Sequence, residues 1–166
     1  MPVTDDFEQF VDQVQVGLNQ FVTGNAALFK EQWSHANDVT VFGGFGGYLR
    51  GWEQVGPGLD VASARFGIGH LTFELLALGM SGDLAYSVWL EKGEVRAVGR
   101  EEPNPVELRV THIYRREDGS WKVTHRHADV TTGKIEAAAA PQQQVFVREQ
   151  SQQDRTTYAM SPGLYL

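Results

Sequence analysis

The sequence contains no cysteine, so the chain can form no disulfide and offers no thiolate as a nucleophile or as a ligand for zinc or an iron–sulfur cluster. It has no long apolar run either: the most apolar stretch, residues 71–80, is interrupted by Glu74 and is too short to span a bilayer. The first residues are acidic and include no apolar segment of the kind that a secretory signal requires. We therefore expect a cytoplasmic protein that does not associate with membranes.

Positive charge is also scarce, with 14 basic residues against 21 acidic ones and a net charge of −7. A surface of that sign repels a phosphate backbone, which argues against nucleic acid as a partner. The stretch 109–126 is locally basic, and either a basic patch or the solvated open face of a sheet would explain it; we favour the second. The glycine-rich run 43–47 is not a phosphate loop, because no Gly-Lys-Ser/Thr follows it.

Helical periodicity comes first along the chain. Apolar residues recur every three or four positions from Phe7 to Phe21, which predicts a helix that begins after Thr4 and buries one face. A second helix is expected at residues 26–35, a short strand at 38–42, and a short third helix from residue 51 to about residue 66.

The pattern then changes to that of strands, which we expect at residues 70–79, 84–91, 106–116 and 121–130. Short turns join them, so neighbouring strands should be antiparallel. Helices followed by such a meander predict an α+β fold with the helices on one face of a single sheet. The composition changes after residue 130 to alanines and glutamines. We therefore expect a domain at residues 1–130 and a C-terminal extension at residues 131–166, either disordered or packed on a dimer partner.

Two motifs stand out within this order of elements: residues 37–42 after the second helix, and the pattern Asp-Gly-x-Trp-x-x-x-x-x-His that begins at Asp118. Over residues 4–130 the chain resembles the SnoaL-like, DUF4440-type branch of the NTF2-like (ketosteroid isomerase-like) superfamily. The resemblance implies a cystatin-like cone, in which a strongly curved antiparallel sheet wraps around the helices. It also implies a cone-shaped pocket for a small apolar molecule and a homodimer packed through the sheets.

One departure from the family pattern affects the expected chemistry. In ketosteroid isomerase-like enzymes a catalytic carboxylate stands five residues after the Asp that opens the first strand. Counting from Asp38 arrives at Gly43, which has no side chain. We therefore do not expect steroid isomerase chemistry in its familiar form.

The last strand decides which polar residues face the helices. Its alternation places one set of residues on one face, Trp121, Val123, His125, His127 and Asp129, and another set on the opposite face, Lys122, Thr124, Arg126 and Ala128. Since the first set contains the large apolar residues, we expect it to point inwards.

The register of the last hairpin decides what lies opposite. If Arg116 pairs with Trp121, His112 also faces inwards, with its Cβ about 5 Å from that of His125. A bulged three-residue turn would shift this register by one residue; we favour the first register because it separates apolar from charged residues more cleanly.

The candidate catalytic residues follow from that arrangement. His127 or His125 could act as a general acid or base, oriented by Asp129. Hydrogen-bonded or interface histidines without a catalytic role explain the pattern equally well, and we favour them narrowly. Alternating histidines on a strand are also adequate as metal ligands, but this pattern is common by accident, so we expect no metal and no cofactor.

Aromatic residues are the candidates for the pocket wall, although plain core residues have the same spacing. Glu91 shares a strand face with Trp89, which leaves open a carboxylate at the pocket mouth or a solvated glutamate near a bend; we favour the second. The full set of expected pocket residues is Trp33, Phe42, Tyr48, Trp52, Tyr86, Trp89, His112 and Trp121.

These observations predict a protein that binds a small apolar ligand in a cone-shaped pocket. It could be a cofactor-independent isomerase, dehydratase, hydrolase or cyclase, and whether it is an enzyme stays open. The alternative is a non-catalytic module for ligand binding or for protein association through dimerisation.

Overall fold

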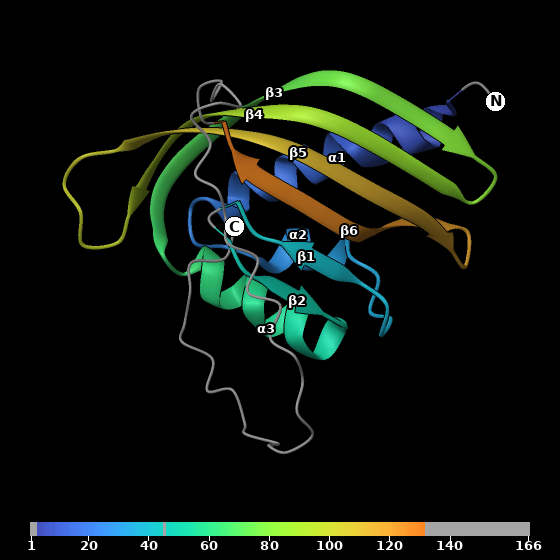
Figure 1. The fold of residues 1–166 in the computed structure, drawn as a ribbon, viewed down its shortest axis with the longest axis horizontal. Coiled ribbons are helices and arrows are strands. Elements are labelled where there is room, and N and C mark those ends of the chain that lie inside the picture. The colour runs from blue at the N-terminus through green and yellow to red at the C-terminus, as the bar shows by residue number, and fades with distance from the viewer. Residues whose placement is uncertain (1–2, 45, 132–166) are drawn as a thin grey trace, which may run out of the picture. The chain divides into compact units, whose positions relative to one another are not determined.

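The computed structural model describes residues 3–44 and 46–131. This part of the chain forms three helices and six strands (Figure 1). In chain order they are α1 (Asp5–Phe21), α2 (Ala27–Glu31), β1 (Thr40–Phe42), β2 (Tyr48–Arg50), α3 (Trp52–Ser63), β3 (Phe66–Ser81), β4 (Leu84–Ala97), β5 (Asn104–Glu117) and β6 (Ser120–Val130). The predicted α+β fold class is confirmed.

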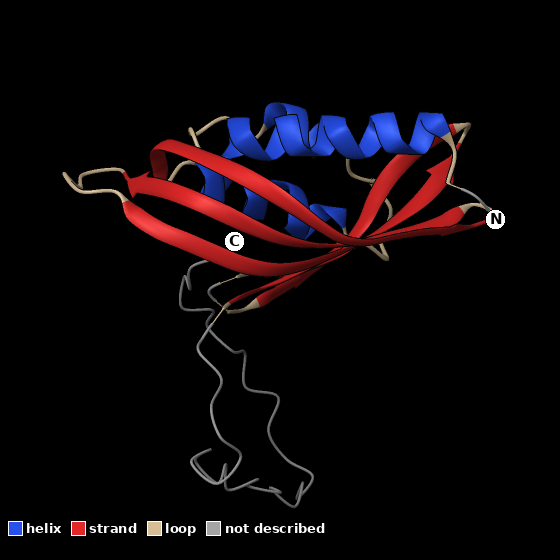
Figure 2. Ribbon diagram, turned by 90° about the horizontal axis from the view of Figure 1, so that it is seen from above, coloured by secondary structure: helices blue, strands red, loops and turns tan. Residues whose placement is uncertain are grey.

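All six strands belong to one sheet with the order β2-β1-β6-β5-β4-β3. The long strands β3 to β6 form the predicted antiparallel meander, whereas β1 joins β6 in parallel. The sheet is strongly curved, and α1 lies across one of its faces (Figure 2). We call the face towards the helices the inner face and the opposite one the outer face.

The core forms where α1 meets the inner face. The predicted apolar stripe of α1 is buried, and Phe7 packs with its ring centroid 4.8 Å from that of Trp121 and 5.2 Å from that of Tyr114. Gly17 lets α1 approach α2 closely: a Cβ atom at this position would lie 3.2 Å from Cα of Phe29 and would collide with Oε1 of Gln32. The helices therefore pack against the sheet and each other as one apolar layer.

Several elements differ from the prediction. The strands β3 and β4 are longer than expected, at Phe66–Ser81 and Leu84–Ala97 against residues 70–79 and 84–91. The second helix ends at Glu31 rather than near residue 35, because the backbone there bonds to β6: Ser34 N donates to Val123 O, and Val123 N donates to Gln32 O. The strand β2 was not predicted. It follows the glycine-rich loop, in which Gly46 and Gly47 have φ angles of 103° and 79° that favour glycine.

The hairpin between β5 and β6 has the favoured register at its turn, where Arg116 pairs with Trp121. Asp118 and Gly119, with φ angles of 48° and 81°, form the two-residue turn. Further along, the register shifts by one residue, because Tyr114 pairs with Val123 but Ile113 pairs with His125.

The shift leaves Thr124 as the extra residue of a β-bulge, and its hydroxyl donates to Ile113 O. A bulge reverses the faces that later side chains take. Arg126 and Ala128 consequently lie on the inner face, while His125, His127 and Asp129 lie on the outer face. The predicted orientation of these three residues was wrong, and so was that of Arg126.

No helix in the described part of the chain is long and apolar enough to cross a membrane. The cytoplasmic location stays a prediction. Apart from Thr131, the predicted extension at residues 131–166 lies outside the described residues.

Candidate ligand pocket and its buried ion pair

The helices and the inner face of the sheet surround an apolar cavity of about 30 Å³, and all three helices and all six strands contribute to its wall. Apolar residues such as Leu18, Leu59 and Leu108 make up the wall, with the exception of Glu91 and Arg126. All of the lining residues except Gly58 are buried. The cavity thus has one polar end.

That polar end is an ion pair between β4 and β6. Nη1 and Nη2 of Arg126 donate to Oε1 and Oε2 of Glu91, each at 2.7 Å. Arg126 is 4% exposed and Glu91 is 1% exposed. The favoured expectation of a solvated Glu91 was therefore wrong. In such a site a bidentate pair is strong, because little water screens its charges.

His112 extends this pair on the strand between them. It lies opposite Arg126 rather than opposite His125 as predicted, and its Nε2 is 3.0 Å from Nη1 of Arg126. A guanidinium group can only donate, so Nε2 accepts and the ring proton stays on Nδ1. Burial, and then the nearby Arg126 charge, hold the pKa of His112 well below its usual range, so the ring is neutral.

The remaining ring nitrogen of His112 has no hydrogen-bond partner. His112 is 1% exposed and its Nδ1 is unpaired. An unpaired buried donor typically costs about 1–3 kcal/mol. The residue lines a second, smaller cavity of about 10 Å³ beneath α1, to which Trp89 and Tyr114 also contribute. Leu18 and Glu91 line both cavities, so the two are neighbours.

A second set of hydrogen bonds lies beside His112 on the inner face. The hydroxyls of Tyr114 and Ser87 are 2.7 Å apart, and Nε1 of Trp89 donates to the same serine oxygen at 2.6 Å. Burial raises the pKa of Tyr114, so its hydroxyl stays protonated. This hydroxyl is already engaged, in contrast to His112 Nδ1.

The three predicted catalytic residues lie away from both cavities. His125 is partly buried on the outer face, where its Nδ1 is 2.7 Å from the hydroxyl oxygen of Thr40. His127 is exposed, and Phe42 packs against both imidazole rings. Asp129 pairs with Arg109 instead of orienting a histidine. Within residues 3–44 and 46–131, no group of three or more His, Asp or Glu side chains is placed to hold a metal ion.

The eight predicted pocket residues are distributed over several places. Trp89 and His112 line the smaller cavity, and none of the eight lines the larger one. Trp33 and Trp121 are buried in the core, and Trp52 stacks on His35 with ring centroids 3.9 Å apart. The remaining three, on the outer side of the sheet, are Phe42, Tyr48 and Tyr86.

The locally basic stretch does not form an open cationic patch. Each of its five cations has an oxygen partner: carboxylates for four of them, and the carbonyl of Glu31 for Lys122. The arginine pairs are Arg109–Asp129, Arg115 with Asp38 and Glu117, Arg116–Asp6 and Arg126–Glu91. These pairs leave little unbalanced positive charge for a phosphate backbone.

Comparisons with known proteins agree with this architecture. Residues 14–132 match the family model of the SnoaL-like domain. The fold is similar to that of a nuclear transport factor 2 (NTF2-like) superfamily protein from Salmonella enterica serovar Typhimurium, with 13% identity, a TM-score of 0.66, and coverage of 79% of this chain and 97% of that one. It is also similar to a ketosteroid isomerase-like protein from Erwinia carotovora atroseptica, with 12% identity, a TM-score of 0.65, and coverage of 79% and 100%.

A protein of unknown function with a cystatin-like fold from Nostoc punctiforme is similar too, with 16% identity, a TM-score of 0.58, and coverage of 79% of this chain and 96% of that one. At these identities the solved structures show the fold alone. No curated protein matches the chain. The family match covers most of the described domain, and the chain therefore belongs to the SnoaL-like domain family.

Proposed function

We propose that this chain binds a small, mostly apolar molecule in the larger cavity and carries out cofactor-independent proton transfer on it at the Glu91–Arg126 pair. The buried pair is the observation that supports this function. Apolar residues of similar volume often replace a buried ion pair without loss of stability, so an ion pair at the end of an apolar cavity is better explained by chemistry than by folding.

The charges at the polar end define the kind of ligand. Arg126 is already neutralised by Glu91, and His112 is neutral. A carboxylate ligand would meet the negative charge of Glu91, whereas a carbonyl or hydroxyl group would not. We therefore propose an uncharged ligand with one polar group.

The proposed reaction uses Glu91 as the proton acceptor and Arg126 as the group that positions it. Isomerases, dehydratases and some hydrolases and cyclases share such a step, and one similar structure is named ketosteroid isomerase-like. In this chain Gly43 leaves the end of β1 without a carboxylate, so Glu91 on β4 would take that part from a different strand.

Ligand entry requires the cavity to widen. A volume of about 30 Å³ holds roughly two water molecules. The helix α3 contributes Gly58 and Leu59 to the wall, and it contains Gly56 and Pro57 in its middle. Glycine and proline are the poorest helix formers, and proline lacks the backbone donor of a regular turn. We propose that α3 moves outwards to admit a single ring.

The test uses two probes of equal size and different charge, acetophenone and benzoate. Acetophenone should raise the melting temperature of the protein and benzoate should not. In heavy water the protein should also speed the exchange of acetophenone methyl protons for deuterium, measured as loss of the methyl proton NMR signal. Glu91→Gln should abolish this exchange, and Glu94→Gln, an exposed glutamate on the same strand, should leave it unchanged.

Failure of acetophenone to bind would exclude this ligand class. Binding with equal exchange rates in Glu91→Gln and the unaltered protein would remove Glu91 from the reaction and leave a binding protein.

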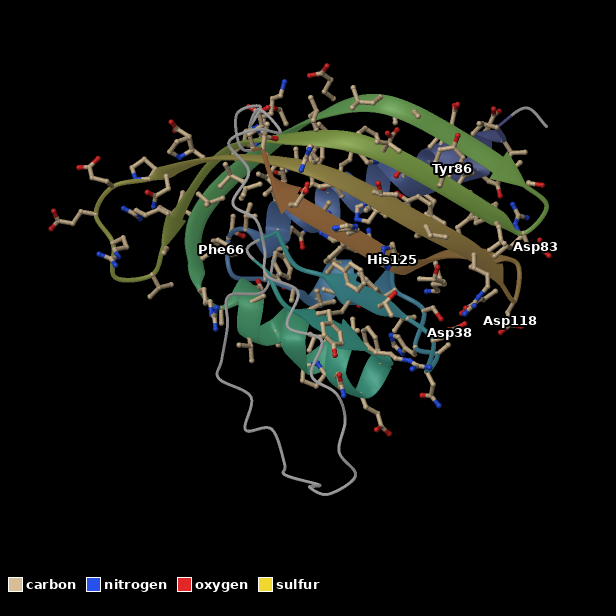
Figure 3. All side chains as sticks on the ribbon, viewed as in Figure 1. Asp38, Phe66, Asp83, Tyr86, Asp118 and His125 are labelled. Carbon is tan, nitrogen blue, oxygen red and sulfur yellow. The ribbon has the colours of Figure 1, made fainter. Side chains whose placement is uncertain are left out.

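The outer face supports a second function, association with another copy of the chain. Tyr86, Ile113 and His125 pair across neighbouring strands and form a row on this face. Figure 3 labels Tyr86 and His125, and no helix of the described residues covers the face (Figure 2). Tyr86 is 46% exposed, and Ile113 and Phe42 are 40% exposed. Apolar centres with polar rims are typical of interfaces.

Paired charges surround this apolar centre, for example Arg109–Asp129 and Lys92–Glu74. A locally neutral rim suits a second copy better than a partner of strong charge, because two identical surfaces then do not repel each other. We propose a homodimer through this face. The extension at residues 131–166 is further proposed to pack on the partner.

Analytical ultracentrifugation tests the dimer. Ile113→Lys should produce a monomer, whereas Val16→Lys, at an exposed apolar residue of α1, should remain a dimer. A monomeric unaltered protein, or a dimer that survives Ile113→Lys, would contradict the interface. Truncation after Val130 separately tests the extension, because an unchanged dimer would exclude its contribution.

A further inference from the structure

We infer that His112 is the hydrogen-bond donor to the ligand, and that the smaller cavity beneath α1 is the subsite that receives an uncharged acceptor oxygen. This inference rests on the proposed function, since it names a second contact for the same ligand. It assigns the oxygen to Nδ1–H of His112 and leaves proton acceptance to Glu91.

Arg126 determines which nitrogen of the His112 ring carries the proton. Nη1 of Arg126 bonds to both Oε1 of Glu91 and Nε2 of His112. Because this nitrogen donates, Nε2 must keep its lone pair free of a proton. The ion pair thus maintains the imidazole as an Nδ1–H donor, and the low pKa of the ring keeps it from gaining a second proton.

The other buried polar groups around the two cavities are already engaged. Both terminal nitrogens of Arg126 bond to Glu91, and the hydroxyl of Tyr114 bonds to Ser87. Four buried side-chain atoms in the described residues have no partner, and of these only His112 Nδ1 belongs to a residue that lines either of the two cavities. A ligand oxygen at this position would therefore satisfy an existing donor.

The size and wall of the smaller cavity restrict what can enter. About 10 Å³ is at the limit for one water-sized group. Val11, Val14 and Phe73 supply apolar walls, and Glu91 contributes a negative charge that disfavours an anion. The subsite thus fits a single carbonyl or hydroxyl oxygen, while the apolar body of the ligand stays in the larger cavity.

Leu18 stands between the two subsites. It lines both cavities and is 3% exposed. A ligand in the larger cavity reaches His112 once this side chain turns aside, so Leu18 controls access to the donor. Leu108 lines only the larger cavity and provides a matched control for a change in volume.

The first measurement needs no ligand. Nitrogen-15 NMR of histidine-labelled protein distinguishes the two neutral tautomers, and we expect Nδ1–H for His112 between about pH 6 and 8. An Nε2–H tautomer would overturn the inference, because Nδ1 would then have no proton to donate.

The second measurement uses acetophenone labelled with carbon-13 at its carbonyl. A hydrogen bond to the oxygen should move the carbonyl resonance downfield in the unaltered protein. His112→Phe should remove this shift and weaken binding about two- to tenfold, as expected for one hydrogen bond. His112→Asn, whose amide can replace the Nδ1 donor, should restore the shift. Leu18→Ala should strengthen the shift more than Leu108→Ala does.

The outcomes separate this inference from the proposed function. If acetophenone binds but its carbonyl shift is the same in His112→Phe and in the unaltered protein, His112 is not the donor and the pocket function stands. If acetophenone does not bind at all, both fail. If His112→Phe does not fold, two other results decide the question. They are the tautomer of His112 in the unaltered protein and the loss of the carbonyl shift of acetophenone in a folded His112→Leu variant.

Discussion

The Glu91–Arg126 pair allows a quantitative prediction about stability. Glu91→Leu leaves the buried Arg126 without a counter-ion. Two unit charges about 4 Å apart interact by about 4 kcal/mol at an effective dielectric constant of about 20. Removal of one partner of a buried pair typically costs about 3–5 kcal/mol. We therefore expect Glu91→Leu and Arg126→Met each to lose about 4 kcal/mol of unfolding free energy.

The double variant should behave differently. Glu91→Leu with Arg126→Met removes both charges and replaces them with apolar side chains of similar length. His112 Nε2 then loses its donor, which costs about 1–3 kcal/mol. We expect the double variant to unfold within about 2 kcal/mol of the unaltered protein, so the double-mutant cycle should give a coupling of several kcal/mol.

Urea unfolding at pH 7.5 gives the free energy of unfolding of all four proteins. Glu94→Leu, at an exposed residue, is the control, and its unfolding free energy should lie within about 0.5 kcal/mol of that of the unaltered protein. The reasoning is refuted if Glu91→Leu costs less than about 1 kcal/mol, or if the double variant is as unstable as the single ones. A stable double variant that no longer exchanges acetophenone protons would separate the chemistry of the pair from its part in folding.

Three further predictions follow from the cavities and the helix packing. Folding lowers the pKa of His112 from its usual 6.5, so the unfolded chain binds more protons than the folded one below this pH. The free energy of unfolding should therefore fall below about pH 6.5, by up to about 1.4 kcal/mol per pH unit. Urea unfolding at about pH 7.5 and 5.5 should show a smaller loss of unfolding free energy in His112→Asn than in the unaltered protein. Leu49 lines the larger cavity, and Gly58→Ala should push its side chain into that cavity and so reduce the stabilisation by acetophenone. Gly67→Ala is the control and should not reduce it, because the nearest atoms to the new Cβ would be 3.8 Å away. Gly17→Ala should lower the urea midpoint by forcing α1 away from α2, at a cost of about 1–3 kcal/mol, and an unchanged midpoint would contradict the close packing at this glycine.

The sequence predicted those elements whose stability comes from their own pattern. The stripe from Phe7 to Phe21 has a helical period, and its residues are buried as expected. The Asp118–Gly119 turn supports positive φ angles, which set the register of the last hairpin. In both cases the deciding interactions lie within a few residues of each other.

Elements that depend on distant partners were predicted less well. The second helix contains no residue that would stop it at Glu31; bonds to Val123, far along the chain, replace its last turn. The strand β2 is three residues long and pairs only with β1, so it has no alternation of its own to detect. Tertiary contacts decide both boundaries.

The buried ion pair of the candidate site was not predicted from the sequence, for a related reason. Glu91 follows Ser87 and Trp89 at a spacing of two, and both of those residues are buried, so its burial could have been predicted from the strand period alone. It was expected in solvent because an isolated glutamate is rarely buried without a partner. The partner, Arg126, was assigned to the other face.

The predicted orientation of Arg126 was wrong because the inward-facing positions of β6 change from odd-numbered to even-numbered residues within the strand. Near the turn, Trp121 packs against Phe7, so the odd-numbered residues face inwards in this first part of the strand. Beyond Thr124 the small Ala128 and the long Arg126 face inwards instead, next to Val110 and His112 on β5. No property of Thr124 itself announces an extra residue, and a bulged strand has the same composition as a regular one.

The bulge also gives the run His125-Arg126-His127 two separate environments. Had the alternation continued, the inner face would hold two imidazoles and the outer face an arginine, and the cavity would lack a permanent cation. With the extra residue, the permanent cation lies inside, where Glu91 balances it, and the titratable rings lie outside beside Phe42. Because adjacent residues of one strand thus serve the cavity and the proposed pairing face, substitutions at His125 and Arg126 should act on different functions despite being neighbours in sequence.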